Sequence, residues 1–234
     1  MNKRVIDTQS QAIQIKEGRT VTLTFKNQPK GQLIIQKRDS VTNQPLSGAE
    51  FRVTTAAGCE VGLDGVIGTS TLTQNGIFTT DGDGEIRLTN LAPGAYVITE
   101  LKAPAGYVID QPSTNVVIGA NGDTQTVVIK NSPKGSLVIV KKDASSNKPL
   151  EGVEFTVTTS SGKFVSNAEG QISSNGVYYT DENGQITITG LEPDTYIVKE
   201  TQALPGYVLD STPQTVVVNT NDTQTLTFWN KQAG

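Results

Sequence analysis

The chain has 234 residues, of which 19 are basic and 23 acidic, and its formal net charge is −4. The charges are spread along the sequence, which argues against a nucleic-acid partner or an anchor for anionic membranes. The chain has no histidine and a single cysteine, Cys59, which excludes Ser-His and Cys-His catalysis, the usual zinc clusters and an intrachain disulfide. No segment reaches membrane-spanning length, and no apolar run typical of a signal peptide follows Met1.

Residues 1–29 are predicted to be the closing strand pair of a truncated preceding repeat, followed by a linker. The segment 5–27, VIDTQSQAIQIKEGRTVTLTFKN, is similar to residues 108–131 and to residues 208–230. Asn27 therefore stands where Asn131 and Asn230 stand, while the sequence before it holds no matching lysine and glutamate. We interpret Asn27 as a third acceptor-type asparagine.

Two complete repeats follow, at residues 30–132 and 133–234. GQLIIQKRDSVTNQPLSGAEFRVTT, which starts at Gly31, is restated as GSLVIVKKDASSNKPLEGVEFTVTT from Gly135, and a period of 104 residues is a whole small domain. Short alternating stretches rich in Val, Ile and Thr predict an all-β protein made of tandem immunoglobulin-like β-sandwiches. The strands expected in the second repeat are 135–142, 153–159, 176–180, 185–189, 195–201, 214–218 and 223–230.

Two loops of the first repeat are candidate ligand sites. Asp81-Gly-Asp-Gly-Glu85 resembles part of a calcium loop, but its counterpart from Asp181 reads Asp-Glu-Asn-Gly-Gln, so a tight turn is predicted and no metal or cofactor is assigned. The region 58–76 is four residues longer than its counterpart 162–176, and it is the one obvious candidate for a binding surface.

A lysine is predicted to point into the core of each repeat. Side chains alternate across a strand, so Lys37 shares a face with Leu33 and Ile35, and Lys141 occupies the matching place in the second repeat. The neighbouring Lys142 is a rival, but its counterpart in the first repeat is Arg38, which points outward and cannot lose its proton near neutral pH.

The same rule places a glutamate and an asparagine in that core layer. The inward glutamates are Glu100 and Glu200, whereas Glu50 and Glu154 alternate outward beside phenylalanines. On the last strand of each repeat the inward polar residue is Asn131 or Asn230.

Buried charges must be neutralised or paired, because burying a lone ammonium or carboxylate costs several kcal/mol. A buried lysine beside a buried carboxyl can lose its proton, and a neutral amine is a nucleophile. If the asparagine Cγ lies within reach, the protonated glutamate can polarise the amide carbonyl and shuttle protons while ammonia leaves, giving a Lys-Asn isopeptide bond. The alternative is a buried ionic and hydrogen-bonded cluster without covalent chemistry.

The chain resembles a known family at this point. Tyr96-Val-Ile-Thr-Glu-Leu-Lys-Ala-Pro-Ala-Gly-Tyr107 and Tyr196-Ile-Val-Lys-Glu-Thr-Gln-Ala-Leu-Pro-Gly-Tyr207 resemble the E-box of Gram-positive pilins. Together with the Lys-x-Asp openings and the Pro-Leu-x-Gly-x-Glu-Phe strands, they make both repeats similar to SpaA-type or Cna protein B-type domains. Leu101 in place of the usual Ser or Thr, and Pro205 one place later than Pro104, depart from the pattern.

The resemblance implies a prealbumin-like β-sandwich with a self-formed isopeptide bond between its first and last strands. Lys37 and Lys141 would be donors, Asn131 and Asn230 acceptors, and Glu100 and Glu200 catalytic acids. It also implies an extracellular place on the bacterial cell surface or cell wall, in the stalk of an adhesin or pilus-like protein whose partners are neighbouring repeats.

Three functional hypotheses follow from these observations. The first is a structural stalk that makes each bond once and is not a turnover enzyme. The second is an adhesive module in which the 58–76 loop binds a host matrix protein or glycan. The third is that residues 5–27 dock on another chain that lacks its last strands, with Asn27 as the acceptor.

Overall fold

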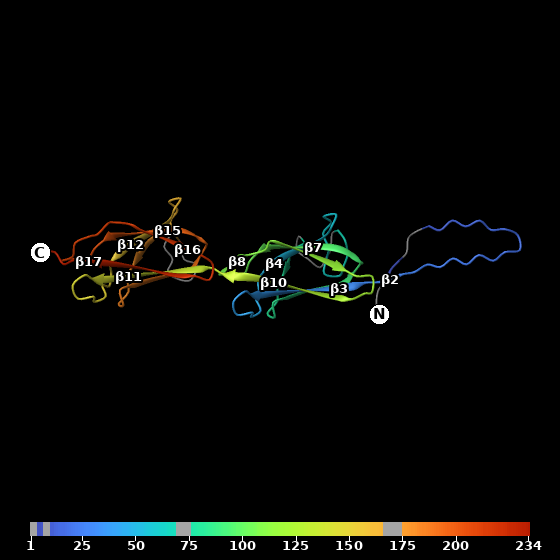
Figure 1. Cartoon of the computed structure of the whole chain (residues 1–234), viewed down its shortest axis with the longest axis horizontal. Coiled ribbons are helices and arrows are strands. Elements are labelled where there is room, and N and C mark those ends of the chain that lie inside the picture. The colour runs from blue at the N-terminus through green and yellow to red at the C-terminus, as the bar shows by residue number, and fades with distance from the viewer. Residues whose placement is uncertain (1–3, 7–9, 69–75, 166–174) are drawn as a thin grey trace. The chain divides into compact units, whose positions relative to one another are not determined.

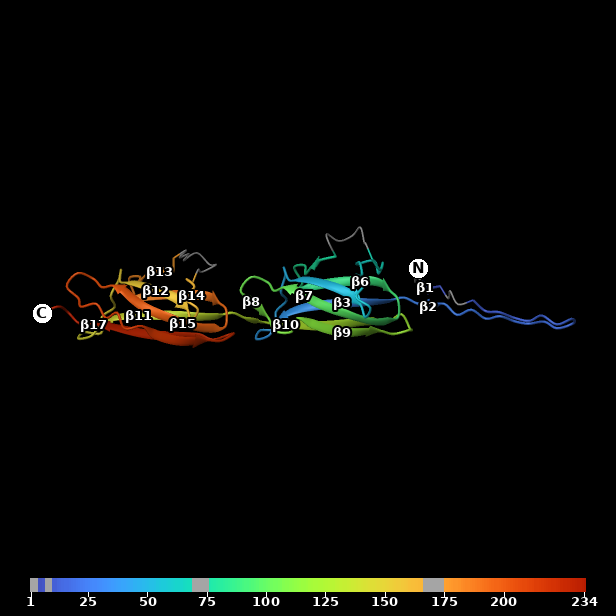
Figure 2. The same ribbon diagram turned by 90° about the horizontal axis from the view of Figure 1, so that it is seen from above.

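A computed structural model describes residues 4–6, 10–68, 76–165 and 175–234 of the chain. It divides into two compact units, Met1–Ala105 with Ile109–Asn131, and Gly106–Val108 with Ser132–Gly234. Both units consist of strands and connecting turns, and the described residues contain no helix (Figures 1 and 2). The all-β prediction is confirmed.

The first unit, taken together with residues 107–108 that complete the edge strand β8, is a sandwich of two four-stranded sheets. One sheet has the order β6-β3-β10-β8 and the other the order β5-β4-β7-β9. The strands are β3 (Gly31–Asp39), β4 (Glu50–Thr55), β5 (Phe78–Thr79), β6 (Glu85–Leu91), β7 (Gly94–Lys102), β8 (Tyr107–Ile109), β9 (Ser113–Ile118) and β10 (Thr124–Pro133).

The second unit repeats this arrangement with sheets of order β14-β11-β17 and β13-β12-β15-β16. Its strands are β11 (Gly135–Asp143), β12 (Glu154–Thr159), β13 (Val177–Tyr179), β14 (Gln185–Leu191), β15 (Asp194–Gln202), β16 (Gln214–Val218) and β17 (Thr223–Asn230). Alternation in the sequence predicted every one of these strands, with ends that differ by at most two residues.

The first and last long strands of each unit lie side by side and run parallel. β10 pairs with β3, and β17 pairs with β11, whereas β4 and β7, β12 and β15, and the pairs that β3 and β11 form with β6 and β14 are antiparallel. The chain therefore enters a unit at one end of this strand pair and leaves it at the other end.

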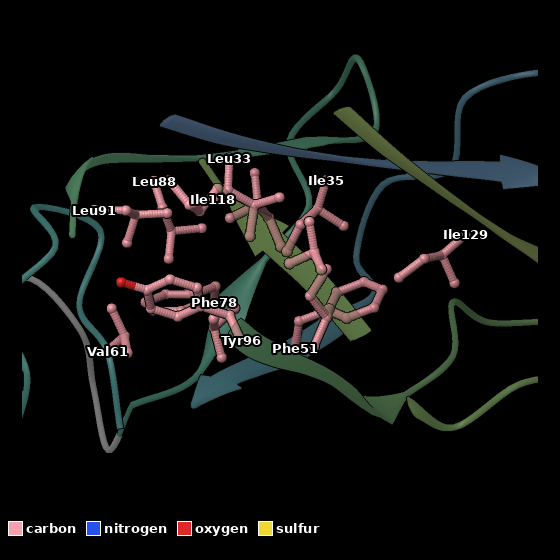
Figure 3. Packing of buried hydrophobic residues seen from close by; sticks show 14 of the residues in the cluster. Leu33, Ile35, Phe51, Val61, Phe78, Leu88, Leu91, Tyr96, Ile118 and Ile129 are labelled. Atoms are coloured by element: carbon pink, nitrogen blue, oxygen red, sulfur yellow. The ribbon is translucent and has the colours of Figure 1, made fainter. Parts of the chain in front are cut away.

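The core between the sheets of the first unit combines aliphatic side chains from both sheets with three aromatic rings from β4, β5 and β7. Figure 3 shows this packing, in which Leu33, Ile35, Leu88, Leu91 and Ile129 face Phe51, Phe78 and Tyr96. Matching residues form the core of the second unit, where the rings of Phe155 and Phe228 meet edge to face at 4.9 Å. Alternation along the strands delivers one side chain in two to this layer.

The two calcium-like segments form tight turns, as predicted. In the first unit Oδ1 of Asp81 accepts hydrogen bonds from the backbone N–H groups of Asp83 and Glu85, and Asp181 makes the same pair of contacts in the second. Gly84 and Gly184 complete these turns at φ values of +72° and +67°, a region that favours glycine. The aspartate carboxylates therefore serve to order the turn backbone.

The N-terminal segment has a different environment. β1 (Arg4–Val5) pairs with β2 (Gln28–Pro29), and residues 10–27 form two extended, exposed arms joined by a turn (Figure 1). In each unit the matching strands, β9 with β10 and β16 with β17, belong to opposite sheets. Strands that match the two arms of residues 5–27 are therefore consecutive in the chain, and each would pair with strands of a different sheet.

One side-chain contact of the N-terminal segment nevertheless has an equivalent inside the second unit. Nε2 of Gln11 donates to the carbonyl oxygen of Thr24 at 3.3 Å, and Nε2 of Gln214 donates to that of Thr227 at 3.0 Å. Both pairs are 13 residues apart and occupy matching places in the aligned segments. The amide bridge between the arms is thus independent of a surrounding sandwich.

Candidate functional site

The structure brings the six predicted site residues together as two buried triples. Lys37 lies on β3, Glu100 on β7 and Asn131 on β10, and each is at most 4% exposed. The second triple consists of Lys141 on β11, Glu200 on β15 and Asn230 on β17, and each is at most 1% exposed. The predicted inward orientation of all six side chains is confirmed.

Strand register explains why the lysine and the asparagine meet. β3 and β10 are paired so that Lys37 is level with Ile129, and Asn131 is level with Asp39. The two residues are therefore diagonal neighbours on one face of adjacent strands, a separation that a long side chain can span. The glutamate comes from the facing sheet.

In the first unit Glu100 contacts both other members of the triple. Its Oε1 accepts a hydrogen bond of 2.6 Å from Nδ2 of Asn131, and its Oε2 lies 3.2 Å from Nζ of Lys37. Nζ also donates to the carbonyl oxygen of Ile129 at 3.4 Å. One carboxyl group thus bridges the amine and the amide.

The second unit repeats the bridge with a looser amine contact. Oε1 of Glu200 accepts from Nδ2 of Asn230 at 2.5 Å, and Oε2 lies 3.7 Å from Nζ of Lys141. The three residues are 63 and 31 positions apart in the first unit and 59 and 30 in the second. Two copies of the same geometry make an accidental grouping of three polar side chains a poor explanation.

Burial pushes the protonation of both partners toward their neutral forms. The pKa of each lysine is lowered chiefly by desolvation, against the attraction of the neighbouring glutamate. The pKa of each glutamate is raised chiefly by desolvation, against the hydrogen bond from the asparagine and the attraction of the lysine. Because both shifts have the same cause, a neutral amine beside a neutral carboxyl is favoured relative to water.

Several atoms of the triples have no hydrogen-bond partner within the described ranges. They are Oε2 of both glutamates, Oδ1 of both asparagines and Nζ of Lys141. A buried ammonium needs acceptors for three N–H groups, and leaving them unsatisfied is costly. The ammonium form of Lys141, whose Nζ lies 3.7 Å from Oε2 of Glu200 and makes no hydrogen bond to another described residue, is therefore disfavoured relative to the neutral amine.

The amide orientation differs from the arrangement expected from the sequence. The sequence predicts that each glutamate acts on the amide carbonyl. In the structure Glu100 contacts the amide nitrogen of Asn131, and Glu200 contacts that of Asn230. An ionised carboxylate can only accept, so it selects the N–H₂ group. A protonated carboxyl can donate instead, and an amide turned about its Cβ–Cγ bond presents Oδ1 at the same place.

The sequence matches the SpaA prealbumin-like fold domain twice, over residues 31–133 and 135–232. The chain belongs to the SpaA family. Its two SpaA-type units are the two sandwiches described above, and the resemblance inferred from the E-box and Lys-x-Asp segments is confirmed. No characterised protein in the curated set matches the sequence.

Solved structures with this SpaA-type arrangement include pilins. The shaft pilin SpaA of Lactobacillus rhamnosus GG is similar with a TM-score of 0.52 and 17% identity, over 88% of this chain and 98% of that protein. A streptococcal ancillary pilin (TM-score 0.49, 24% identity) and the Bacillus anthracis TIE protein (0.41, 26%) match 87% and 91% of this chain. The chain spans 62% of the former and 38% of the latter.

The residues that the sequence excluded from the SpaA-type site lie outside it. Arg38 and Lys142 alternate away from the core and are partly exposed. Glu50 lies 3.4 Å from Lys102, and Glu154 accepts from Tyr179 and Thr201, all on the outer face. Comparing the two repeats was therefore sufficient to choose between neighbouring lysines and between glutamates.

The departures from the E-box pattern do not change the loop that follows it. Residues 105–106 and 205–206 form the same turn, with Gly106 at φ +81° and Gly206 at φ +85°. Pro104 is buried, and Leu204 at the matching place packs against the core of the second unit.

The other predicted sites have different outcomes. Within the 58–76 loop, residues 69–75 lie outside the described residues, so the proposed binding surface has no structural account. Asn27 lies on an exposed arm of the N-terminal segment. The described residues hold no group of three or more candidate metal ligands and no helix long and apolar enough to cross a membrane.

Sequence reasoning missed one part of the site. Asp143 is 2% exposed and lies on the same face of β11 as Lys141, and Asp39 is buried at the matching place of β3. The repeated Lys-x-Asp spacing was a usable signal, because residues i and i+2 of a strand share a face.

Proposed function

We propose that the two SpaA-type units are structural stalk domains of a Gram-positive cell-surface or pilus-like protein, each closed by a Lys-Asn isopeptide bond that it forms itself. One observation carries the proposal: in both units a buried carboxyl bridges a buried amine and a buried amide on adjacent strands. The pilins of similar fold support the cell-surface assignment. Each unit reacts once, so the chain is not a turnover enzyme.

The chemistry is an exchange of one amide for another. The neutral Nζ of Lys37 attacks Cγ of Asn131, a new Nζ–Cγ bond forms, and the Cγ–Nδ2 bond breaks. Glu100 receives the proton that the attacking amine loses and delivers one to Nδ2, which leaves as ammonia. Atoms balance without a cofactor, and the carboxyl returns to its starting protonation state.

The strand arrangement suggests a mechanical role for such a bond. A pull applied to both ends of a unit acts on β3 and β10, or on β11 and β17, which are the strands that the bond would join. Force would pass from lysine to asparagine, and the strands between them would carry none. Closing a loop of about 94 residues also adds roughly 4–5 kcal/mol of stability by chain entropy.

Intact-mass measurement tests the proposal on the full chain. We expect the mass to be lower than that of the sequence by two ammonia molecules, one for each unit. Glu100→Gln and Glu200→Gln should each restore one ammonia, because the amide side chain keeps the shape of the carboxyl but cannot shuttle protons. Lys37→Met and Asn230→Ala should each restore one as well.

Glu154→Gln is the matched control for Glu200→Gln. It makes the same chemical change on the adjacent strand β12, at a side chain that faces outward. We expect the control to lose both ammonia molecules, and fragmentation should find Lys37 joined to Asn131 and Lys141 joined to Asn230. A native chain with the full mass of its sequence would exclude the bond and leave the ionic cluster as the correct description.

Residues 1–29 receive a separate proposal. We infer that residues 5–27 are the closing strand pair of a further SpaA-type unit and that Asn27 is its acceptor. The support is the match with residues 208–230 and the amide bridge that Gln11 and Gln214 share.

A further inference from the structure

Asp143 is a buried carboxylate whose hydrogen-bonding capacity is fully used. Its Oδ1 accepts from the backbone N–H groups of Ser145 and Ser146, both at 2.8 Å. Its Oδ2 accepts from the hydroxyl of Tyr207 at 2.8 Å and from Nε2 of Gln232 at 3.2 Å. The residue is level with Asn230 on the neighbouring strand and two residues beyond Lys141 on its own.

These four donors come from the three segments that carry the reacting triple. The serines belong to the turn after β11, the strand of Lys141. Tyr207 follows β15, the strand of Glu200, and Gln232 follows β17, the strand of Asn230. One carboxylate therefore links the ends of the donor, acid and acceptor strands.

Backbone hydrogen bonds extend this link to the acceptor itself. The N–H of Ala144 donates to the carbonyl oxygen of Asn230 at 2.9 Å, so the turn ordered by Asp143 holds the acceptor's own peptide group. Val208 donates to Lys231 at 2.9 Å, and Ala233 donates to Gly206 at 2.8 Å. The loop after β15 is thus paired with the residues that follow Asn230.

The charge state of Asp143 distinguishes it from Glu200. Hydrogen bonds from Ser146, Tyr207 and Ser145 hold the pKa of Asp143 well below its usual range, whereas burial raises that of Glu200. Asp143 is therefore ionised near neutral pH and can only accept hydrogen bonds. Its two oxygens are taken up by the four donors described above, so it is suited to holding groups in place.

The first unit repeats the turn part of this arrangement around Asp39. Asp39 is level with Asn131, and its Oδ1 accepts from the N–H groups of Val41 and Thr42 at 2.7 and 3.0 Å. The N–H of Ser40 donates to the carbonyl oxygen of Asn131 at 2.9 Å. Repetition in a second unit argues for a role shared by both sites.

We propose that Asp143 and Asp39 are positioning residues for isopeptide closure, fixing the acceptor strand so that the asparagine Cγ lies within reach of the lysine. The inference rests on the proposed function. Attack of an amine on an amide requires the reacting atoms to be held about 3–3.5 Å apart, and a displacement of about 1 Å can slow such a step about 100-fold. Asp143 acts through the turn, Tyr207 and Gln232, and does not touch the reacting atoms.

The test follows bond closure in time. The full chain is synthesised in a cell-free reaction, sampled at intervals and weighed intact, with the first unit as an internal standard. We expect Asp143→Ala to slow loss of the second ammonia about 10- to 100-fold, and Tyr207→Phe, which removes one of the four donors, to slow it less. The pH profile of closure should keep its native shape in Tyr207→Phe, because Asp143, Lys141 and Glu200 are all unchanged.

Tyr178→Phe separates positioning from general stability. It removes a buried hydroxyl that donates to the carbonyl oxygen of Val165 at 2.8 Å, away from the triple. We expect it to lower the melting temperature about as much as Tyr207→Phe without slowing closure. Closure at the native rate in both Asp143→Ala and Tyr207→Phe would overturn this inference and leave the proposed function standing. A native chain that never loses ammonia would overturn the proposed function and this inference with it.

Discussion

A fully buried lysine is stable only if its charge is paired or removed, and Lys37 and Lys141 are both 0% exposed. The carboxyl beside each lysine is buried too, so desolvation acts on both members of the pair and favours their neutral forms. The same burial that would make an ammonium costly thus produces the nucleophile that the proposed reaction needs.

The backbone of the donor lysine is held by a glycine on the facing turn. Lys141 N–H donates to the carbonyl oxygen of Gly184 at 2.7 Å, and a methyl group added to Gly184 would lie 2.5 Å from the carbonyl oxygen of Lys141. We expect Gly184→Ala to lower the free energy of unfolding by about 3 kcal/mol, from a positive φ combined with overpacking. Denaturant unfolding measures the change.

Gly190→Ala is the matched control for Gly184→Ala. Both glycines have φ of +67°, but nothing lies within 4 Å of a methyl group on Gly190. We expect a loss of only about 1 kcal/mol there. At the corresponding place in the first unit Asn90 adopts φ +57°. Equal losses at the two glycines would contradict the claim that close approach to Lys141 matters.

Asp143 gives the second unit a pH-dependent contribution to stability. Its pKa is lower in the folded state than in the unfolded chain, so its contribution is present above the ordinary aspartate pKa of about 4 and is lost as pH falls below that value. We expect the native chain to exceed Asp143→Asn in melting temperature near pH 7, and the difference to shrink progressively as the pH falls from about 4 to about 2. A constant difference across this range would count against the ionised carboxylate.

The reacting residues could be predicted from sequence because each is placed by strand alternation and each occurs twice. Lys142, Glu50 and Glu154 were excluded by the same two facts. The positioning contacts of Asp143 could not be predicted, since Tyr207 and Gln232 lie 64 and 89 residues away in the chain and approach it only through the folded loops. Alternation gives the face of a side chain, and the contacts on that face depend on tertiary packing.

At the scale of elements, the strands were predictable because half of each strand's side chains enter an apolar core. The pairing of the first and last strands in parallel was not readable from alternation, which is the same for either direction. Residues 10–27 show the limit of such patterns. Ile15 and Phe25 alternate like the buried Val218 and Phe228, yet they are 74% and 54% exposed, because no sheet of the described chain covers them.

Segment exchange tests whether residues 5–27 are a competent closing pair. Replacing residues 208–230 with the sequence of residues 5–27 keeps the length at 23 residues and leaves an asparagine at position 230. We expect the exchanged chain to fold and to lose two ammonia molecules, like the native chain, because the apolar alternation and the glutamine of the amide bridge are retained. Intact mass and thermal unfolding measure both properties.

A shifted version of the same exchange is the control. Moving the inserted sequence by one residue turns its apolar face outward and removes the asparagine from the core layer. That chain should lose only the first unit's ammonia. If the in-register exchange also keeps the second ammonia while the native chain loses both, residues 5–27 are not a closing pair for a SpaA-type unit.

At the scale of the whole chain, the proposed bonds decide how much of the polypeptide can be extended by force. In each unit the residues between the lysine and the asparagine lie inside the closed loop, about 94 in the first unit and 89 in the second. Of the joined strands, residues 31–36 of β3, 132–133 of β10 and 135–140 of β11 lie outside these loops. A chain with both bonds therefore resists lengthening even when its sheets are disrupted.

Single-molecule stretching of the full chain measures this property. We expect no unfolding step from either unit of the native chain. Asn131→Ala should give one step of roughly 300 Å, because about 94 residues at 3.3–3.6 Å each are released. Adding Asn230→Ala should give a second step. Asn27→Ala makes the same change outside the two sandwiches and should add no step. Steps of this length in the native chain would mean that force passes through the strands between lysine and asparagine. The units would then resist extension only by the hydrogen bonds between β3 and β10 and between β11 and β17.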